Sequence, residues 1–182
     1  MSDIILFGGT FDPPTIAHIE VAKRSMDAIS ASGVLFVPAF QSPLKNNTIT
    51  NPLHRLNMLK YALNDDSWAS ISMIELEREG VSYTIDTVEM LVSEGMCVRL
   101  LIGADQWSQF DKWHRYETLL KLANPIVIPR DGIDVPANRL LKIEPVYCSS
   151  TEARLAIQAG NDTTSMLHPS VAAYIAEHGL YR

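Results

Sequence analysis

An apolar run that leads into a glycine-rich loop is the feature that most limits how this chain can fold. Residues 4–7 (IILF) have the length and composition of a buried strand, and residues 16–32 have the pattern of a helix. Between them stand Gly8 and Gly9, followed by T-F-D-P-P-T, and His18 lies about one turn into the helix. Paired glycines let a ligand approach the backbone, and the free N–H groups of a helix start attract anions. The segment therefore predicts a phosphate site, although it matches neither G-x-G-x-x-G nor G-x-x-x-x-G-K-[ST].

Strand-like and helix-like segments alternate along the whole sequence, which predicts an α/β fold with a doubly wound, mostly parallel sheet and right-handed crossovers. Strands are expected at residues 4–7, 34–38, 69–74, 98–102, 125–128 and 140–143. Helices are expected at residues 16–32, 52–64, 84–94, 116–123, 151–159 and from 169 to about 178. The length of 182 residues, without a repeat or a linker, fits one domain, 1–182, with a C-terminal helical part from about residue 149.

Several turns that contain glycine or polar residues fall directly after predicted strands. Besides the glycine loop, these are Gly103-Ala104-Asp105, Pro129-Arg130 and Ser149-Ser150. In parallel sheets, ligands bind beyond the carboxyl ends of the strands. We therefore expect the four segments to converge on one ligand site.

Composition argues against several classes of protein. The formal net charge of −6 and the pI of about 5.3 disfavour nucleic-acid binding, which usually requires a basic surface. No apolar run approaches the ~20 residues of a membrane helix, and the N-terminus lacks the basic flank of a signal peptide. Cys97 and Cys148 have no zinc-site or C-x-x-C spacing, and two lone thiols fit a reducing cytoplasm. The sequence contains no metal-ligand motif such as H-E-x-x-H and leaves a homo-oligomer open.

The glycine segment, G-G-T-F-D-P followed by T-I-A-H, resembles the signature of the nucleotidylyltransferases, which is a strand, G-G-T-F-D-P and [HT]-x-G-H. Further motifs follow in the order found in that family and resemble those of the bacterial nicotinate mononucleotide adenylyltransferases. They are S-P-L-K (42–45), H-R-L-N-M-L (54–59), S-Y-T-I-D-T (82–87), G-A-D (103–105) with K-W (112–113), I-P-R (128–130) and S-S-T-E-A-R (149–154). The resemblance covers nearly the whole chain and implies a Rossmann-like nucleotidylyltransferase fold.

The resemblance also implies a reaction of NAD biosynthesis, in which ATP donates its adenylyl group to nicotinate mononucleotide and deamido-NAD and pyrophosphate are formed. It places the catalytic residues His18, Thr15 and Arg154 at the reacting phosphates. It implies an ATP site made of Gly8, Gly9, Thr10, Phe11, His18, Gly103, Asp105, Arg130, Ser149, Ser150, Thr151 and Arg154. It implies a mononucleotide site made of Lys45, Tyr83, Thr84, Trp113 and His114. Mg²⁺ would arrive with ATP and would not occupy a site formed by the protein alone.

Most of these residues also have a plain structural interpretation. S-S-T-E is an ordinary helix start, Asp105 can cap a turn, and a lone tryptophan such as Trp113 usually packs in a core. Loop lysines such as Lys45 are mostly solvated, and the plain interpretation of Arg55 is a helix cap or an ion-pair partner. The order of the motifs favours the functional interpretation.

Three positions depart from the usual pattern of the nicotinate enzymes. Thr15 replaces their histidine and matches the phosphopantetheine adenylyltransferases, Ala17 replaces a glycine, and His114 replaces a tyrosine. Two alternatives therefore stay open: an adenylyltransferase for nicotinamide mononucleotide or phosphopantetheine, and a non-catalytic nucleotide sensor. Trp113 favours a pyridine nucleotide because an aromatic platform suits a flat heterocycle. The presence of both His18 and Arg154 argues against a sensor.

Overall fold

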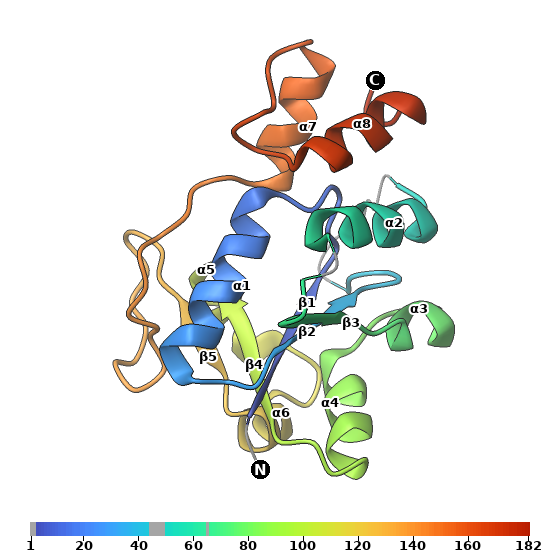
Figure 1. The fold of residues 1–182 in the computed structure, drawn as a ribbon. Helices are drawn as coiled ribbons and strands as arrows, with labels where there is room; N and C mark the ends of the chain where they lie inside the picture. The colour runs from blue at the N-terminus through green and yellow to red at the C-terminus, as the bar shows by residue number, and fades with distance from the viewer. Residues whose placement is uncertain (1–2, 44–49, 65) are drawn as a thin grey trace.

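The structure is a computed structural model that describes residues 3–43, 50–64 and 66–182. Within these residues, five strands form one parallel sheet in the order β3-β2-β1-β4-β5 (Figure 1). The strands are β1 (Ile4–Gly9), β2 (Val34–Pro38), β3 (Ala69–Ile71), β4 (Val98–Gly103) and β5 (Ile126–Ile128). The predicted doubly wound, parallel α/β sheet is thus confirmed.

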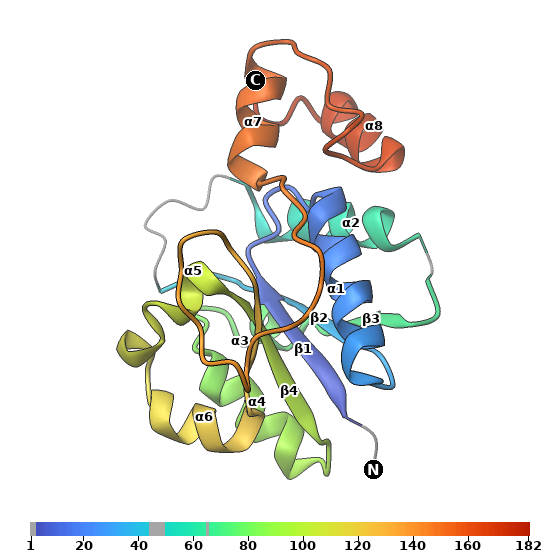
Figure 2. The ribbon, with the colours of Figure 1, turned by 90° about the vertical axis from the view of Figure 1, so that its left-hand side faces the viewer.

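Helices cover both faces of the sheet. Ile5 and Phe7 of β1 pack on the face covered by α1 (Ile16–Ile29) and α2 (Pro52–Leu63). Leu6 packs on the opposite face, with α4 (Thr84–Ser93) and α6 (Tyr116–Ala123) (Figure 2). A central parallel strand that is buried on both faces must be apolar throughout, which explains the run IILF.

The chain winds outward from β1 in two directions, so that β2 and β3 lie on one side of it and β4 and β5 on the other. In β1, Phe7 pairs with Phe36 of β2, and Leu6 pairs with Leu100 of β4. The winding reverses between β1 and β4, and in sheets of this kind a crevice opens beyond the carboxyl ends of the strands at such a point. The glycine loop that follows β1 and the turn at Gly103 therefore lie at the same crevice.

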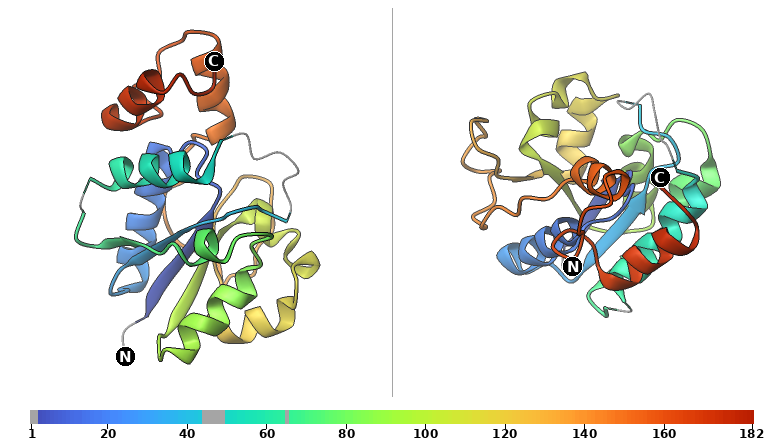
Figure 3. Two further views of the ribbon diagram at one scale, coloured as in Figure 1. Left: turned by 90° about the vertical axis from the view of Figure 1, so that its right-hand side faces the viewer. Right: turned by 90° about the horizontal axis from the view of Figure 1, so that it is seen from above.

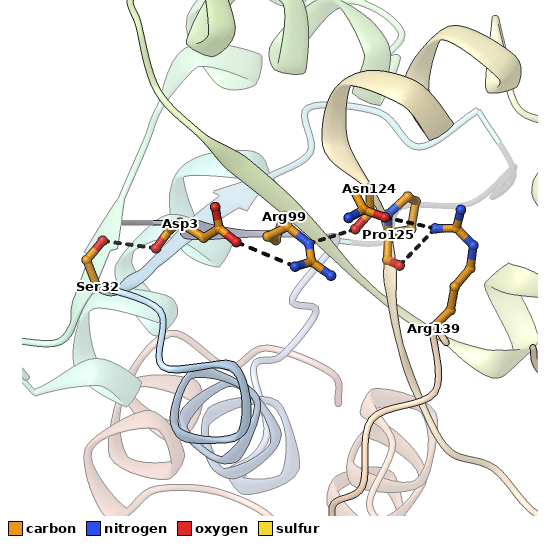
Figure 4. A network of polar contacts seen from close by, with 6 residues as sticks. All are labelled: Asp3, Ser32, Arg99, Asn124, Pro125 and Arg139. Carbon is orange, nitrogen blue, oxygen red and sulfur yellow. Dashed lines mark hydrogen bonds and ion pairs between the residues drawn. The ribbon is translucent and has the colours of Figure 1, made fainter. Parts of the chain in front are cut away.

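Polar contacts join neighbouring strands at the opposite edge of the sheet. Arg99 donates from Nε to the carbonyl of Asn124 (2.9 Å) and from Nη1 to the Asp3 carboxylate (3.4 Å) (Figure 4). The Ser32 hydroxyl donates to the carbonyl of Asp3 at 3.0 Å. Since these residues stand at or just before the starts of β1, β2, β4 and β5, this network holds the amino-terminal edge of the sheet and lies away from the crevice.

Two helices, α7 (Ser150–Gln158) and α8 (Pro169–Glu177), form the C-terminal part of the chain above the carboxyl ends of the strands (Figures 1 and 2). Helix α8 packs along α2, and both views of Figure 3 show the two helices side by side. Their contact is a small apolar cluster that includes Met58, Val171 and Ile175. None of the helices in the described residues is long and apolar enough to cross a membrane.

Some predicted boundaries were wrong. The first helix ends at Ile29, and not at residue 32, because Ser30 adopts a left-handed backbone with φ of 52°. The strand predicted at residues 69–74 ends at Ile71, and α3 (Ile74–Arg78) follows it. The strand predicted at residues 140–143 is reduced to one bridge between Leu140 and Val127.

Two further short elements had no counterpart in the sequence prediction. They are α5 (Ala104–Trp107) and the 3₁₀ helix η1 (Phe110–Lys112). Both are shorter than the window over which an apolar period can be recognised. They nevertheless shape the loop that carries Trp113.

Candidate active site

A cavity of about 700 Å³ opens beyond the carboxyl ends of β1 and β4. All four predicted turn segments contribute to its wall, so the expected convergence is observed. The predicted site residues that line it are Gly8, Gly9, Thr10, Phe11, His18, Tyr83, Thr84, Gly103, Asp105, Trp113, His114, Arg130 and Ser150. Thr15, Ser149, Thr151 and Arg154 do not line this cavity, and Lys45 lies outside the described residues.

The glycines of the cavity wall serve different purposes. A Cβ built on Gly8 or on Gly103 would meet no protein atom within 4 Å, and neither residue has a positive φ. Protein packing therefore does not require glycine at these two positions, whereas close approach of a ligand to the backbone would. A Cβ on Gly9, in contrast, would come within 2.8 Å of the ring of Phe11, which is 2% exposed. Gly9 is thus needed by the core that supports the loop.

His18 occupies the first turn of α1 in a fixed orientation. Its Nδ1 accepts a hydrogen bond from the backbone N–H of Thr15 at 3.0 Å. Because an N–H group can only donate, Nδ1 must be the acceptor, and the hydrogen of the neutral ring lies on Nε2. The ring of Phe11 meets the imidazole edge-on, with 5.4 Å between centroids. The arrangement makes His18 a hydrogen-bond donor through Nε2.

Thr15 supports His18 and does not line the main cavity. The residue is 1% exposed, and its Oγ1 lies 2.7 Å from Nδ1 of His18. We expected this hydroxyl to donate to a phosphate, but the structure directs it to the imidazole. Burial raises the pKa of the neighbouring Cys148 thiol, and a hydrogen bond with Thr15 partly opposes the shift.

A buried arginine anchors the glycine loop from below. Arg55 has no exposed surface, and its guanidinium donates to the carbonyls of Thr10 (2.7 Å), Phe40 (3.1 Å) and Thr50 (3.2 Å). Burial lowers the pKa of Arg55, while the charge of Asp12 opposes that shift. Since Thr10 and Phe40 follow β1 and β2 respectively, Arg55 ties together the loops that leave two neighbouring strands.

A second anchor comes from the end of the chain. The phenol of Tyr181 donates to Oδ1 of Asp12 at 2.5 Å, and Asp12 is 4% exposed. Burial raises the pKa of Tyr181, and its hydrogen bond with Asp12 raises it further. The segment that follows α8 thereby fixes the turn of the glycine loop.

The start of α7 is attached to the same loop. Arg154 donates from Nη1 to the carbonyl of Asp12 at 2.6 Å, and the Ser150 hydroxyl donates to the carbonyl of Pro13 at 2.8 Å. Ser149 caps the helix, because its Oγ accepts from the N–H of Glu152 at 3.1 Å. Arg154 also donates to Oγ1 of Thr151 at 3.2 Å. The loop and the helix start therefore form one unit, of which Ser150 reaches the cavity wall.

The other end of the cavity is aromatic and includes a helix start. Helix α4 begins at Thr84, and its N-cap residue, Tyr83, makes no capping hydrogen bond through its side chain. The rings of Tyr83 and His114 lie 4.7 Å apart. Trp113 packs against Phe110 at 5.3 Å, and within the described residues its buried Nε1 has no hydrogen-bond partner. This end combines flat apolar surfaces with the N–H groups of a helix start, which suit an anionic group.

An exposed ion pair stands at the rim near β4 and β5. Nε of Arg130 lies 3.5 Å from Oδ2 of Asp105, and both side chains are about half exposed. Such pairs contribute little to stability, so the two side chains can exchange partners at small cost. The N–H of Gly103 donates to Oε1 of Gln106 at 3.1 Å.

Sequence reasoning missed the buried side chains that support the site. Asp12 stood in the glycine motif but had no assigned role, and Arg55 had no predicted function. Glu75, which is 5% exposed and lines the cavity, comes from α3, a helix that was not predicted. No local sequence pattern indicated a role for Tyr181, because its hydrogen-bond partner, Asp12, lies 169 residues away in the sequence.

Comparisons with known proteins identify the family of this chain. The model of the cytidylyltransferase-like family matches residues 6–156. A probable nicotinate-nucleotide adenylyltransferase of Hydrogenobaculum sp. (strain Y04AAS1) is 38% identical, with 98% of this chain and 97% of the relative covered. A second, of Herpetosiphon aurantiacus, is 34% identical and covers 100% of this chain and 99% of the relative.

A solved structure has the same fold. The nicotinic acid mononucleotide adenylyltransferase of Plasmodium falciparum, complexed with NaAD, superposes with a TM-score of 0.84. The superposition covers 100% of this chain and 98% of the Plasmodium chain, and the two sequences are 23% identical. Given the family model and the full-length relatives, the chain belongs to the cytidylyltransferase-like family and, within it, to the nicotinate-nucleotide adenylyltransferases.

Proposed function

We propose that this protein transfers the adenylyl group of ATP to nicotinate mononucleotide and releases pyrophosphate. The observation that carries the proposal is that the two ends of one cavity are lined by different kinds of groups. One end has an open glycine backbone, His18 and the start of α7, which suit a triphosphate. The other end has Trp113, Tyr83 and the uncapped start of α4, which suit a flat ring with an acidic substituent.

The chemistry needs no protein nucleophile. The phosphate of the mononucleotide has a second pKa of about 6 and is largely ionised at pH 7. One of its oxygens attacks the α-phosphorus of ATP, a new P–O bond forms, and the bond to the β-phosphate oxygen breaks as pyrophosphate leaves. Catalysis then consists of holding the two phosphates in line and stabilising the charge that develops.

His18 is the residue that we assign to the α-phosphate. Its ring hydrogen lies on Nε2, because Nδ1 accepts from the backbone of Thr15, so the ring would donate to the phosphate through Nε2. A donor held in place in this way does not have to reorient when charge builds up, which is the basis of preorganised stabilisation. Thr15 is a positioning residue in this proposal, since its hydroxyl contacts the imidazole.

The remaining ATP contacts follow the cavity wall. Gly8, Gly9, Thr10 and Phe11 would offer backbone at the phosphates, Gly103 and Asp105 would lie at the ribose, and Arg130 would join them at the rim. Ser149, Ser150 and Thr151 at the start of α7 would face the β- and γ-phosphates. Arg154, whose guanidinium already lies on the glycine loop, would reach the leaving group by exchanging one of its two hydrogen bonds.

The mononucleotide contacts occupy the aromatic end. Trp113 would stack on the pyridine ring, and Tyr83 and His114 would close over its edge. The backbone at Tyr83 and Thr84 would receive the carboxylate of the ring at the start of α4. Lys45, which lies outside the described residues, stays a predicted contact of the mononucleotide.

The side chains around the cavity fit a Mg²⁺ ion that arrives bound to ATP. In the part of the chain that the structure describes, no three His, Cys, Asp or Glu side chains form a group that could hold a metal. Mg²⁺ usually keeps several waters and binds through substrate phosphates, so it does not require a cage of protein side chains. When bound, the ion would neutralise charge on the phosphates.

We also place the protein in the cytoplasm, which suits the free thiols of Cys97 and Cys148.

The experiment that tests this function is a comparison of three acceptors. Purified protein is mixed with Mg²⁺, ATP and either nicotinate mononucleotide, nicotinamide mononucleotide or phosphopantetheine, and pyrophosphate release is followed. We expect the highest kcat/KM with the nicotinate compound. A reaction with phosphopantetheine alone would move the protein to another branch of the superfamily, and ATP binding without any turnover would support a nucleotide sensor.

A further inference from the structure

A buried carboxyl group stands at the aromatic end of the cavity. Glu75 comes from α3, is 5% exposed and lines the same cavity as Ser82, Tyr83 and Thr84. Its Oε1 accepts a hydrogen bond from the hydroxyl of Thr87, in the first turns of α4, at 2.7 Å. Glu75 therefore lies beside the helix start that would receive the substituent of the pyridine ring.

An acidic side chain in this place does not fit a pocket that only attracts a carboxylate. Two neighbouring carboxylates do not ionise together without a large cost, so one of them takes up a proton. An amide substituent carries no charge and has no such conflict with an ionised Glu75. The same side chain therefore affects an acid and an amide differently.

We propose that Glu75 is a specificity-determining residue, which favours the acid over the amide on the pyridine ring when it is protonated and loses this preference when it is ionised. The proposal rests on the proposed function, because it assumes that the ring binds at Tyr83 and Thr84. In the protonated state, the O–H of Glu75 can donate to the substrate carboxylate. In the ionised state, the two negative charges repel each other.

The surroundings of Glu75 act on its pKa in both directions, and burial, which raises it, is the largest effect. Burial raises the pKa of Glu75, and the nearby charge of Asp86 on α4 raises it as well. The hydroxyls of Thr87 and Ser82 and the charge of Arg78 on α3 lower it. Among the described residues, the other charged or titratable side chains that line the cavity are His18, Tyr83, Asp105, Lys112, His114, Arg130, Tyr147 and Cys148.

The sign of the pH dependence follows from proton linkage. If the acid substrate binds the protonated form, its binding is complete below the pKa of Glu75. Above that pKa, binding weakens by about tenfold per pH unit, because each unit removes nine-tenths of the remaining protonated form. Binding of the amide substrate lacks this loss, and the phosphate that both substrates share cancels from their ratio. The ratio of kcat/KM for acid over amide should therefore fall as pH rises.

The test measures this ratio between pH 6 and 9 for the wild-type protein and for Glu75→Gln, which keeps the shape but cannot ionise. We expect the wild-type ratio to fall as pH rises through the pKa of Glu75, by up to about tenfold per pH unit, and the Glu75→Gln ratio to stay flat. Thr87→Val removes a hydrogen bond to the ionised carboxylate, so it should move the fall to higher pH. The matched control is Glu77→Gln, an exposed carboxylate on the same helix, which should follow the wild-type profile.

Calorimetry supplies a second readout that needs no turnover. In buffers of different ionisation enthalpy, wild-type protein should take up more protons on binding nicotinate mononucleotide than on binding its amide, and Glu75→Gln should take up equal numbers. A flat wild-type ratio, or a Glu75→Gln profile that matches the wild type, overturns the proposal while the proposed function stands. If neither compound reacts, the proposed function fails, and the proton uptake measured on binding then tests the role of Glu75 by itself. If neither compound binds, both proposals fail.

Discussion

Replacing Tyr181 by phenylalanine removes one buried hydrogen bond and preserves the shape of the ring. The phenol donates to Oδ1 of Asp12, a carboxylate that is 4% exposed. A hydrogen bond to a charged group contributes about 1.5–3 kcal/mol to the free energy of unfolding. In a chain of 182 residues, each kcal/mol lowers the melting temperature by about 2–4 °C, so Tyr181→Phe should melt about 3–12 °C below the wild type.

The assay is thermal unfolding, followed by circular dichroism, with a matched control. Tyr147 also donates its phenol to a carboxylate, at 2.8 Å from Asp131, but it is 63% exposed. Tyr147→Phe should change the free energy of unfolding by no more than about 0.5 kcal/mol. A Tyr181→Phe protein that melts within about 1 °C of the wild type would refute the claim that the C-terminal segment anchors the glycine loop.

Three further substitutions test the roles assigned to the cavity. His18→Ala should lower kcat by roughly 10²–10³ with little change in the Kd for ATP, and an unchanged kcat would reduce His18 to a structural residue. Thr15→Val, which removes the hydroxyl at 2.7 Å from Nδ1 of His18, should lower kcat by about 2–10-fold, and Thr15→Ser should restore it. Equal rates in the wild type and both variants would contradict a positioning role. Trp113→Ala should raise KM for the mononucleotide by about 5–150-fold and leave KM for ATP almost unchanged, whereas a parallel rise in both with a lower melting temperature would make Trp113 a packing residue.

Local pattern was sufficient for the centre of the fold. The run at residues 4–7 is apolar because β1 is buried on both faces, and that same burial made the strand recognisable. The helix start at Ser149 was recognisable because S-x-x-E satisfies two backbone N–H groups within four residues, and both hydrogen bonds are present. Signals of this kind are contained in the sequence itself.

Short or long-range features were not predictable in the same way. Residues 140–143 have the composition of a strand, yet their pairing is limited to one bridge, between Leu140 and Val127, because strand pairing depends on the neighbouring segment of the chain. Helix α3 spans five residues and leaves no periodic signal. Consequently Glu75, which is carried by that helix, could not be placed in the cavity.

The motifs predicted which segments meet at the cavity but not what each side chain does there. Thr15 was expected at a phosphate, whereas in the fold its hydroxyl contacts His18. Arg55 was left without a function, because its three acceptors are backbone carbonyls, which have no residue-specific signature. Roles that depend on backbone acceptors require the fold before they can be recognised.

The most direct test of the central claim is a label-transfer measurement with nicotinate mononucleotide and Mg²⁺. With ATP labelled at the α-phosphate, the proposed reaction predicts that the label appears in deamido-NAD, in a one-to-one ratio with the pyrophosphate released. With ATP labelled at the γ-phosphate, the label should appear only in pyrophosphate. Transfer of the γ-label to the mononucleotide, or release of pyrophosphate without a labelled dinucleotide, would contradict adenylyl transfer at this cavity.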